Sequence, residues 1–117
     1  MNILIKIIIS SLAVLLSAYL LPGVHVDSYV TAILVAIVLA LLNGFLKPIL
    51  IIFTIPITVF TLGLFLLVIN AAIILLTDNF VDGFYVDGWL WALIFSFVLS
   101  ILTSVMESLG GKKKQHS

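Results

Sequence analysis

The chain has 117 residues, of which 64% are hydrophobic and only 9% are charged, and its formal net charge is zero. An ordinary soluble domain is roughly half apolar and a quarter charged, so this composition excludes a soluble enzyme, a nucleic-acid-binding protein with a basic surface and a disordered segment. The sequence contains no cysteine, which excludes disulfides, thiolate metal sites and cysteine nucleophiles within it. It predicts an all-α integral membrane protein with four transmembrane helices.

The first apolar stretch predicts a membrane span over residues 3–21. Pro22 and Gly23 end this span, because proline cannot continue a helix and glycine tolerates the turn that follows. A secretory signal peptide has a similar basic start and apolar stretch, but the residues before Pro22 lack the small-residue pattern of a cleavage site. We therefore expect the span to be retained.

The second predicted span covers residues 29–47. It ends before Pro48, because proline disfavours the helical conformation of the residue that precedes it. Lys47 is the last residue of this span, and we expect its side chain to extend to the interface as an anchor rather than to pair with a substrate.

The uncharged stretch 49–77 is longer than the about 20 residues of one upright span and too short for two. Pro56 divides it into a short interfacial connector, residues 49–55, and a third span, residues 57–77. Irregular backbone at this division must lie at the interface or inside protein, because lipid offers no hydrogen-bond partners.

A polar loop, residues 78–87, leads into a fourth predicted span over residues 88–108. Trp89 and Trp91 fall at the beginning of that span, where interfacial aromatic residues are common. Residues 109–117 form a flexible basic tail.

Four spans place both termini and the middle connector on one side of the membrane. That side carries every lysine of the chain, and the other side carries four of the five acidic residues. The lysines are Lys6, Lys47 and Lys112–Lys114, and the four acidic residues are Asp27, Asp78, Asp82 and Asp87. Because cytoplasmic segments are enriched in lysine and arginine, we predict that both termini are cytoplasmic and that residues 1–117 form one integral membrane domain.

A shift of 60 residues aligns the two halves of the chain and pairs the segment Gly23–Asp27 with Gly83–Asp87, both of which read G-x-x-V-D. Small residues also recur at every fourth position of the second and fourth spans. These small-residue rows are Ala32, Ala36, Ala40 and Gly44, and Ala92, Ser96, Ser100 and Ser104.

Rows of this kind let membrane helices approach closely, although alanine and serine are also simply common in membrane spans. We favour the first interpretation. It predicts two parallel helical hairpins, residues about 3–44 and 63–104, related by a pseudo-two-fold axis along the membrane normal, with the two rows at a helix interface.

Two asparagines, Asn43 and Asn70, lie within or near the ends of apolar spans. Each amide needs a hydrogen-bond partner there, because hydrocarbon offers none. A contact with a pore or substrate is one interpretation; we favour hydrogen bonding between helices or to backbone groups freed near Pro48.

Catalytic, cofactor and metal sites are not predicted. The four aspartates on the side of the membrane opposite the lysines, together with His25, could attract a divalent cation, but their spacing is not that of a calcium loop. Serine, histidine and aspartate are too scattered for a nucleophilic triad. The expected partners are the lipid bilayer and further copies or other membrane proteins, with no nucleic acid and no small-molecule substrate identified.

The central part of the chain resembles the phage holin family of the four-span superfamily IV type. The resemblance is carried by Leu42-Asn43-Gly44, Lys47-Pro48-Ile49, Thr54–Thr58, Thr61–Phe65 and Val68–Ala71, and within them the candidate family residues are Asn43, Lys47, Pro48, Pro56, Gly63 and Asn70. It implies four spans and a bacterial cell membrane. We expect a non-enzymatic envelope protein that acts as an oligomer; the alternatives are a true holin that releases a lysin, and a minor channel or transporter.

Overall fold

The computed structural model describes the backbone of residues 2–116 and the side chains of residues 2–109. This part of the chain is mostly helical, as predicted, with one pair of very short strands. The helices are α1 (Ile3–Leu20), α2 (Tyr29–Leu41), the π-helix η1 (Leu42–Leu46), α3 (Lys47–Phe53), α4 (Ile55–Phe60), α5 (Phe65–Phe80) and α6 (Trp89–His116), and the strands are β1 (Val24–Val26) and β2 (Phe84–Val86).

Three helical stretches are long and apolar enough to cross a membrane: Ile3–Leu20, Tyr29–Phe53 and Trp89–Leu109. The fourth apolar helix, α5, has only 16 residues. At a rise of 1.5 Å per residue α5 is about 24 Å long, which is less than the ~30 Å of the hydrocarbon core. The prediction of a chain built from several apolar helices is confirmed.

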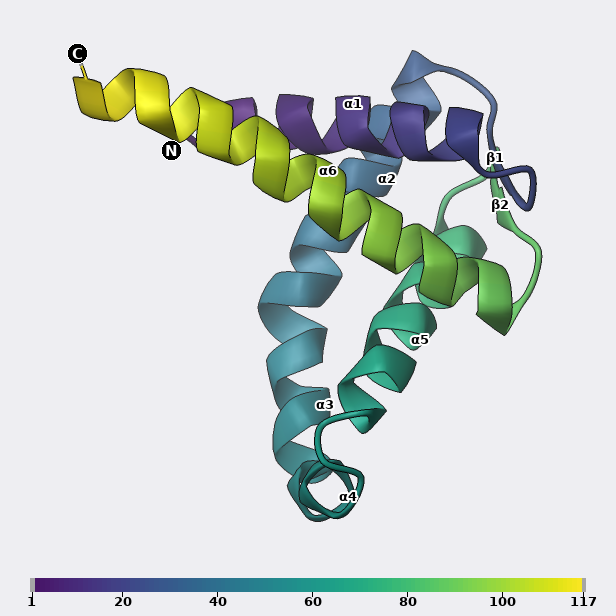
Figure 1. Cartoon of the computed structure of the whole chain (residues 1–117). Helices are drawn as coiled ribbons and strands as arrows, with labels where there is room; N and C mark the ends of the chain where they lie inside the picture. The colour runs from purple at the N-terminus through teal and green to yellow at the C-terminus, as the bar shows by residue number, and fades with distance from the viewer. Residues whose placement is uncertain (1, 117) are drawn as a thin grey trace.

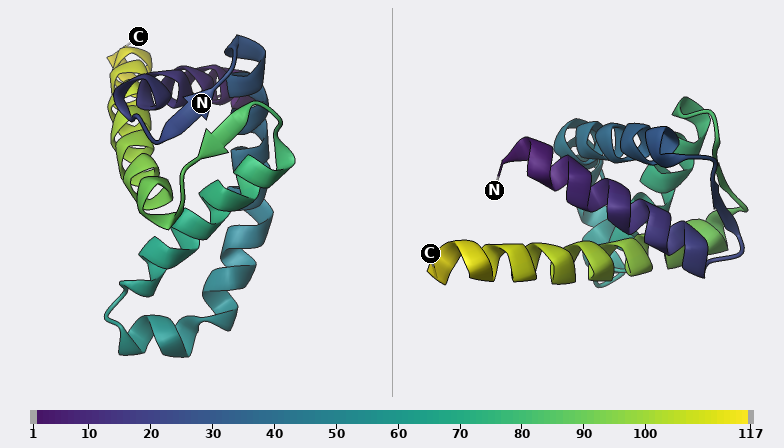
Figure 2. Two further views of the ribbon diagram at one scale, coloured as in Figure 1. Left: turned by 90° about the vertical axis from the view of Figure 1, so that its right-hand side faces the viewer. Right: turned by 90° about the horizontal axis from the view of Figure 1, so that it is seen from above.

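The helices meet at one end of the molecule and diverge at the other (Figures 1 and 2). We call the meeting point the sheet end, because β1 and β2 lie there beside the last turns of α1 and α5 and the first turns of α2 and α6. From the sheet end, α1 and α6 run as one arm, and α2–α3 and α5 as a second arm. The start of α1 and the end of α6 lie at the tip of the first arm, and α4 lies at the tip of the second arm; we call this diverging side of the molecule the open end.

The strand pair joins two segments that are far apart in the sequence. Two hydrogen bonds flank the antiparallel strands: the Asp27 N–H donates to the Gly83 carbonyl (3.0 Å), and the Asp87 N–H donates to the Gly23 carbonyl (2.8 Å). Strands of three residues are too short for an alternation of side chains to be recognised, so the sequence pattern predicts a loop here.

Side chains alternate across this strand pair as they do in longer sheets. Val24, Phe84 and Val86 are buried, whereas His25 and its cross-strand partner Tyr85 are exposed. The pair thereby covers the end of the helical core and presents its polar face outward.

The buried core occupies the halves of the helices nearest to the sheet end. Its largest fully buried apolar side chains are Val14, Val35, Ile73 and Phe95, one from each of the four long helices. The Phe95 ring lies 5.6 Å from the ring of Phe84, so the strand pair and the core form one continuous apolar cluster.

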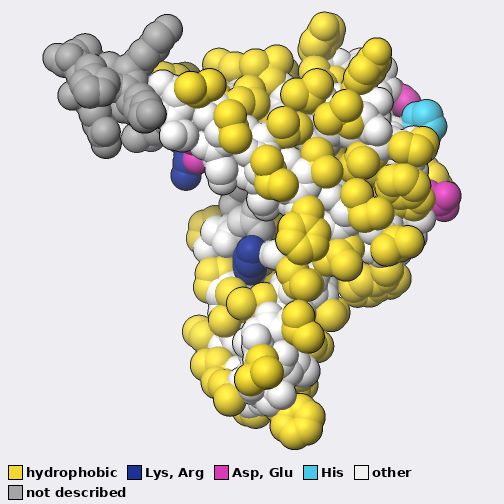
Figure 3. All heavy atoms as spheres, viewed as in Figure 1, with side chains coloured by type: hydrophobic (Ala, Val, Ile, Leu, Met, Phe, Trp, Pro, Cys, Tyr) yellow, Lys and Arg dark blue, Asp and Glu magenta, His cyan; other side chains and the backbone are white. Residues whose placement is uncertain are grey.

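Hydrophobic side chains also cover most of the visible outer surface, while in this view acidic and histidine side chains lie at the right and lysine side chains lie at the left and partway along the second arm (Figure 3). Leu62 is 93% exposed, Phe60 88% and Tyr19 87%. Exposed apolar surface on this scale is unfavourable in water and favourable in a bilayer.

The helix that begins at Tyr29 continues to Phe53, whereas we predicted that it ends at Lys47. The π-helix η1 explains the difference. In it the Lys47 N–H donates to the carbonyl of Leu42, five residues earlier, and the wider turn leads the chain past Pro48. Pro48 is the second residue of α3, and the continuous helix does without the hydrogen bond that an N–H at this position would donate.

The helix ends at Thr54 rather than at Pro56. Thr54 has φ −107° and ψ 12°, and its hydroxyl donates to the Leu50 carbonyl at 2.7 Å. The same carbonyl also accepts from the Thr54 N–H at 3.1 Å, so Thr54 donates to it twice at the end of α3. Pro56 lies in the first turn of the next helix, α4, in the same position that Pro48 has in α3.

The third apolar helix, predicted over residues 57–77, is divided into α4 and α5. Between them Leu62 (φ 58°) and Gly63 (φ 89°) adopt left-handed conformations, which end a right-handed helix. The second part continues to Phe80, so Asp78, which we placed in the polar loop, lies in the last turn of α5.

The remaining boundaries agree closely with the sequence. The first helix ends one residue before the predicted end of 3–21, and the last begins one residue after the predicted start of 88–108. The tail 109–117 differs, because the backbone of α6 stays helical to His116. The side chains of Lys112–Lys114 lie outside the described residues.

Gly23→Ala should destabilise the protein. A Cβ at this buried position would collide with the Trp91 indole, and overpacking of this kind costs about 1–3 kcal/mol. Far-UV circular dichroism during heating in detergent should show a lower Tm. Gly44→Ala is the matched control, because a Cβ there meets nothing within 4 Å, and a helical alanine is neutral or stabilising. Equal Tm values for the two variants would contradict the close contact.

Candidate functional site

A cavity of about 410 Å³ opens between the two arms at the open end of the molecule. It is bounded by the first turns of α1, by the end of α2 with η1, and by the last part of α6 whose side chains are described. The lining residues are Ile3, Lys6, Ile7, Ser10, Ala36, Ala40, Asn43, Gly44, Thr103 and Glu107.

The cavity concentrates polar groups in a molecule that is otherwise apolar. Five of its ten lining residues carry a charged, amide or hydroxyl group: Lys6, Ser10, Asn43, Thr103 and Glu107. In the view of Figure 3, an acidic and a basic side chain overlap at the lower edge of the first arm, on the side that faces the notch between the arms. Polar groups at such places in membrane helices are expensive, and they usually mark functional sites.

Asn43 enters the cavity from η1, and the proline that follows shapes its surroundings. The carbonyl of Asn43 would accept from residue 47 in an α-helix and from residue 48 in a π-helix. The Lys47 N–H donates to Leu42 instead, and Pro48 has no N–H. The main-chain carbonyl of Asn43 therefore lacks both of these helical donors.

The two small-residue rows divide between the core and the surface. The halves nearest to the sheet end are buried, and the halves nearest to the open end are exposed: Ala32, Ala36, Ala92 and Ser96 are buried, and Ala40, Gly44, Ser100 and Ser104 are exposed. Ala36, Ala40 and Gly44 line the cavity, and their lack of bulk creates its space.

The other candidate family residues lie apart from the lining. Lys47 and Pro48 begin α3, Pro56 begins α4 and Gly63 forms the turn before α5. Asn70 is half-buried on α5, between the buried Ile69 and Ala71. Of the six candidate family residues, the structure places Asn43 alone among the lining residues of this cavity.

Sequence reasoning gave no site role to Lys6, Ser10, Thr103 or Glu107. A signal for some of them was present in the 60-residue shift, which pairs Thr103 with Asn43. Polar residues therefore recur at equivalent positions. Lys6 and Glu107 look like ordinary charges at helix ends until the tertiary structure brings α1 and α6 to one cavity.

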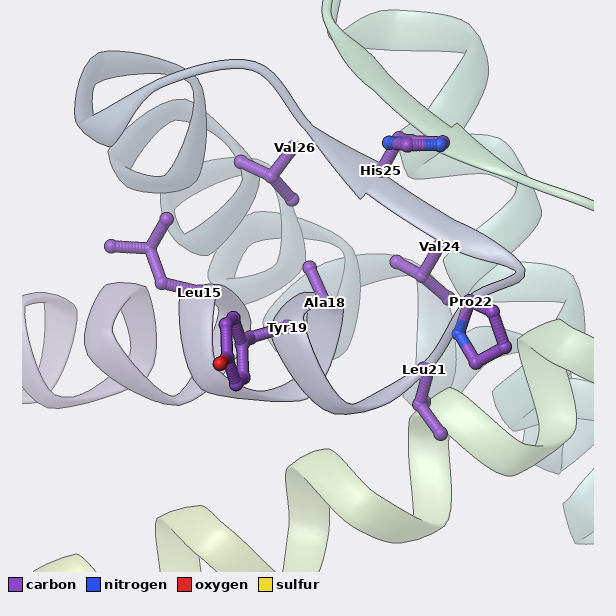
Figure 4. A pocket seen from close by; sticks show the side chains of 8 residues that line it. All are labelled: Leu15, Ala18, Tyr19, Leu21, Pro22, Val24, His25 and Val26. Atoms are coloured by element: carbon purple, nitrogen blue, oxygen red, sulfur yellow. The ribbon is translucent and has the colours of Figure 1, made fainter.

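A second hollow, of about 330 Å³, lies at the sheet end between α1 and β1 (Figure 4). Its polar side chains are Tyr19 and His25, which lie on separate sides of β1 in Figure 4 and so do not converge on one ligand atom. The other lining residues are Leu15, Ala18, Leu21, Pro22, Val24 and Val26.

Two of the four aspartates at the sheet end make side-chain hydrogen bonds. An Asp78 carboxylate oxygen accepts from the Val86 N–H (3.0 Å), and an Asp87 oxygen accepts from the Tyr85 hydroxyl (3.5 Å). Among the residues that the structure describes, no three histidine, aspartate or glutamate side chains are grouped as metal ligands.

Comparison with known proteins identifies relatives over nearly the whole chain. Residues 1–105 match the family described as mycobacterial 4 TMS phage holin, superfamily IV. The chain is 38% identical to the uncharacterized membrane protein YvlD of Bacillus subtilis, over 83% of this chain and 82% of that protein. It is 35% identical to an uncharacterized protein of Streptomyces coelicolor, over 87% and 90% of the two chains. No solved structure matches.

Asn43→Cys should react with a small charged thiol reagent added from the side of the open end, because the cavity admits water to this position. The sequence has no native cysteine, so the label reports one site. Leu41→Cys is the matched control, since Leu41 lies only two residues away and its exposed side chain does not line the cavity. Equal and slow labelling of the two variants would show that the cavity is closed to water.

Proposed function

From the geometry above, and because the chain belongs to the family of mycobacterial 4 TMS phage holins of superfamily IV, we propose that it is a four-span protein of the bacterial cell membrane. We further propose that it is not an enzyme and that it binds a ligand in its open-end cavity. The cavity is the observation that carries the proposal. It offers one amine, one carboxylate, an amide and two hydroxyls, which suit recognition by hydrogen bonds and charge. Its lining contains no histidine or cysteine to serve as a base or nucleophile near neutral pH.

The proposed cavity is a binding site rather than a through-pore in the single chain. The apolar core lies between the cavity and the sheet end, and it includes the fully buried Val35 and Phe95. Water or ions that enter from the open end would have to cross this cluster to reach the other side.

We propose that both termini and the cavity face the cytoplasm. Support comes from the distribution of charge between the two ends. Lys6, Lys47 and Glu107 belong to the open end, whereas the aspartates lie around the sheet end together with Trp89. Lysine enrichment favours the cytoplasmic side.

The two-hairpin repeat also belongs to this proposal. It is supported by the two hydrogen bonds that flank the strand pair. The 60-residue shift makes Asp27 equivalent to Asp87 and Gly23 equivalent to Gly83, so the two bonds join equivalent atoms of the two halves. A two-fold axis that relates the halves would pass between His25 and Tyr85. These two residues are paired in the strands and are also equivalent under the 60-residue shift.

Packing inside the helices supports the same repeat. Ser17 and Thr77 occupy equivalent positions, are fully buried, and donate their hydroxyls to the carbonyl four residues earlier at 2.7 Å and 2.9 Å. Ala32 and Ala92, also equivalent, are both fully buried in the first turns of α2 and α6.

We propose self-association through the exposed half of the α6 row. Ser100 and Ser104 are exposed and do not line the cavity, so a second copy could approach α6 closely there. A true holin is the alternative function, and the same exposed small residues favour it, because assembly of many copies is what a membrane lesion requires.

Reporter fusions test the orientation. A fluorescent protein fused after Ser117 should fluoresce, because it would fold in the cytoplasm, and alkaline phosphatase inserted after Asp82 should be active, because it would be exported. The reverse pattern would contradict the proposed orientation.

Vesicle permeability tests the closed cavity against a holin or channel. Liposomes that contain the purified protein should keep a potassium diffusion potential as long as empty liposomes do, since the core blocks a path through the single chain. Co-expression of a lysin should leave cells intact for the same reason. Loss of the potential together with abrupt lysis would contradict the proposal and favour the holin.

A further inference from the structure

We propose that the open-end cavity holds the headgroup of a zwitterionic phospholipid, one that carries a phosphate and a primary amine. This inference rests on the ligand-binding cavity proposed above and names the chemical class of its ligand. The reasons are the charges of the cavity, their depth along the helices, the free hydrogen-bonding groups and the shape of the floor.

The charges of the cavity are one cation and one anion from different helices. Lys6 comes from α1 and Glu107 from α6, and both line the same space. A ligand with a phosphate and an ammonium group can place each of its charges beside the opposite charge of the protein. A purely anionic headgroup would bring its charge towards Glu107, and a metal cation would face a single carboxylate and the Lys6 amine.

These two residues lie at the depth of lipid headgroups. Lys6 is in the first turn of α1, and Glu107 is two residues before the end of the apolar stretch Trp89–Leu109. Residues at the ends of membrane-spanning stretches reach the polar interface, where phosphates and amines of lipids are found.

Deeper in the cavity, hydrogen-bonding groups remain available to a ligand. The Thr103 hydroxyl already donates to the Leu99 carbonyl at 2.8 Å, so it offers lone pairs. Ser10 and Asn43 make no side-chain hydrogen bond to other residues of the described chain, and both can donate to phosphate or glycerol ester oxygens.

The floor of the cavity is made of small residues, and its mouth is apolar. Ala36, Ala40 and Gly44 leave room for a glycerol unit, and Ile3 and Ile7 border the space with apolar side chains. Ile3 at the border of the cavity is 67% exposed, so the acyl chains of a bound lipid can lie against the apolar outer surface of α1 and remain in the bilayer. This lateral access favours a lipid over a soluble ligand with the same headgroup.

Lipid titration of the full-length protein in detergent, followed by native mass spectrometry, tests the proposal. Phosphatidylethanolamine should bind about tenfold more tightly than phosphatidylglycerol, because a charge-assisted hydrogen bond is worth about one order of magnitude in affinity. Lys6→Gln should lower the affinity for phosphatidylethanolamine about tenfold. Lys47→Gln is the matched control, since Lys47 belongs to the same end of the molecule and does not line the cavity.

Two further variants test separately the charge of the cavity and its free volume. Glu107→Gln should abolish the preference for phosphatidylethanolamine over phosphatidylglycerol, because the group that faces the amine loses its charge. Gly44→Leu keeps both charges and should abolish binding by filling the cavity. A Cβ at Gly44 meets nothing within 4 Å, so this variant is expected to fold, which its circular dichroism checks.

Equal affinity for the two lipids, or equal losses in Lys6→Gln and Lys47→Gln, would overturn the proposal. If soluble glycerophosphoethanolamine competes at the same concentration as the lipid, the ligand is not specifically a lipid. The assignment of a ligand with a phosphate and a primary amine would then still hold. The reactivity of Asn43→Cys distinguishes a failure of the phospholipid assignment from a failure of the proposed open cavity. A reactive cysteine with no lipid preference refutes this inference alone, whereas an unreactive cysteine refutes the open cavity itself.

Discussion

The reciprocal hydrogen bonds of the strand pair are the interaction on which the remaining architecture depends. They tie two distant loops together at a point where four helix ends meet, and Val24, Phe84 and Val86 of the same strands close the apolar core. The close contact between Gly23 and the Trp91 indole adds packing to this joint. Because the arms are joined there and diverge beyond it, the polar cavity can form at the opposite end.

The need to satisfy polar groups explains the irregular stretch between the second and third apolar helices. A helix that contains Pro48 must give up one N–H, and η1 accommodates the loss without ending the helix. The carbonyl that loses its α-helical and π-helical donors belongs to Asn43, a residue that lines the cavity together with an amine, a carboxylate and two hydroxyls. Backbone irregularity in membrane proteins is tolerated where it lines a polar space, and this cavity provides one.

Composition and apolar runs were sufficient to predict the helices, because lipid imposes length and hydrophobicity directly on the sequence. Local chemistry was less informative at the prolines: Pro48 and Pro56 look alike in sequence, yet the helix passes the first and breaks at Thr54, just before the second. The cavity could be predicted only in part. Asn43 stands out in an apolar span, whereas Lys6 and Glu107 acquire their significance from the contact between the first and last helices.

The divergence of the arms has a consequence for the membrane itself. The molecule measures 43 × 34 × 22 Å along its principal axes, and it is narrow at the sheet end and broad where the arms separate. With the sheet end outermost, as proposed, the helices of one copy would spread over a larger area of the inner leaflet than of the outer leaflet. Such a wedge favours a bilayer that curves towards its narrow side, so clusters of this protein would prefer, or generate, regions of defined spontaneous curvature.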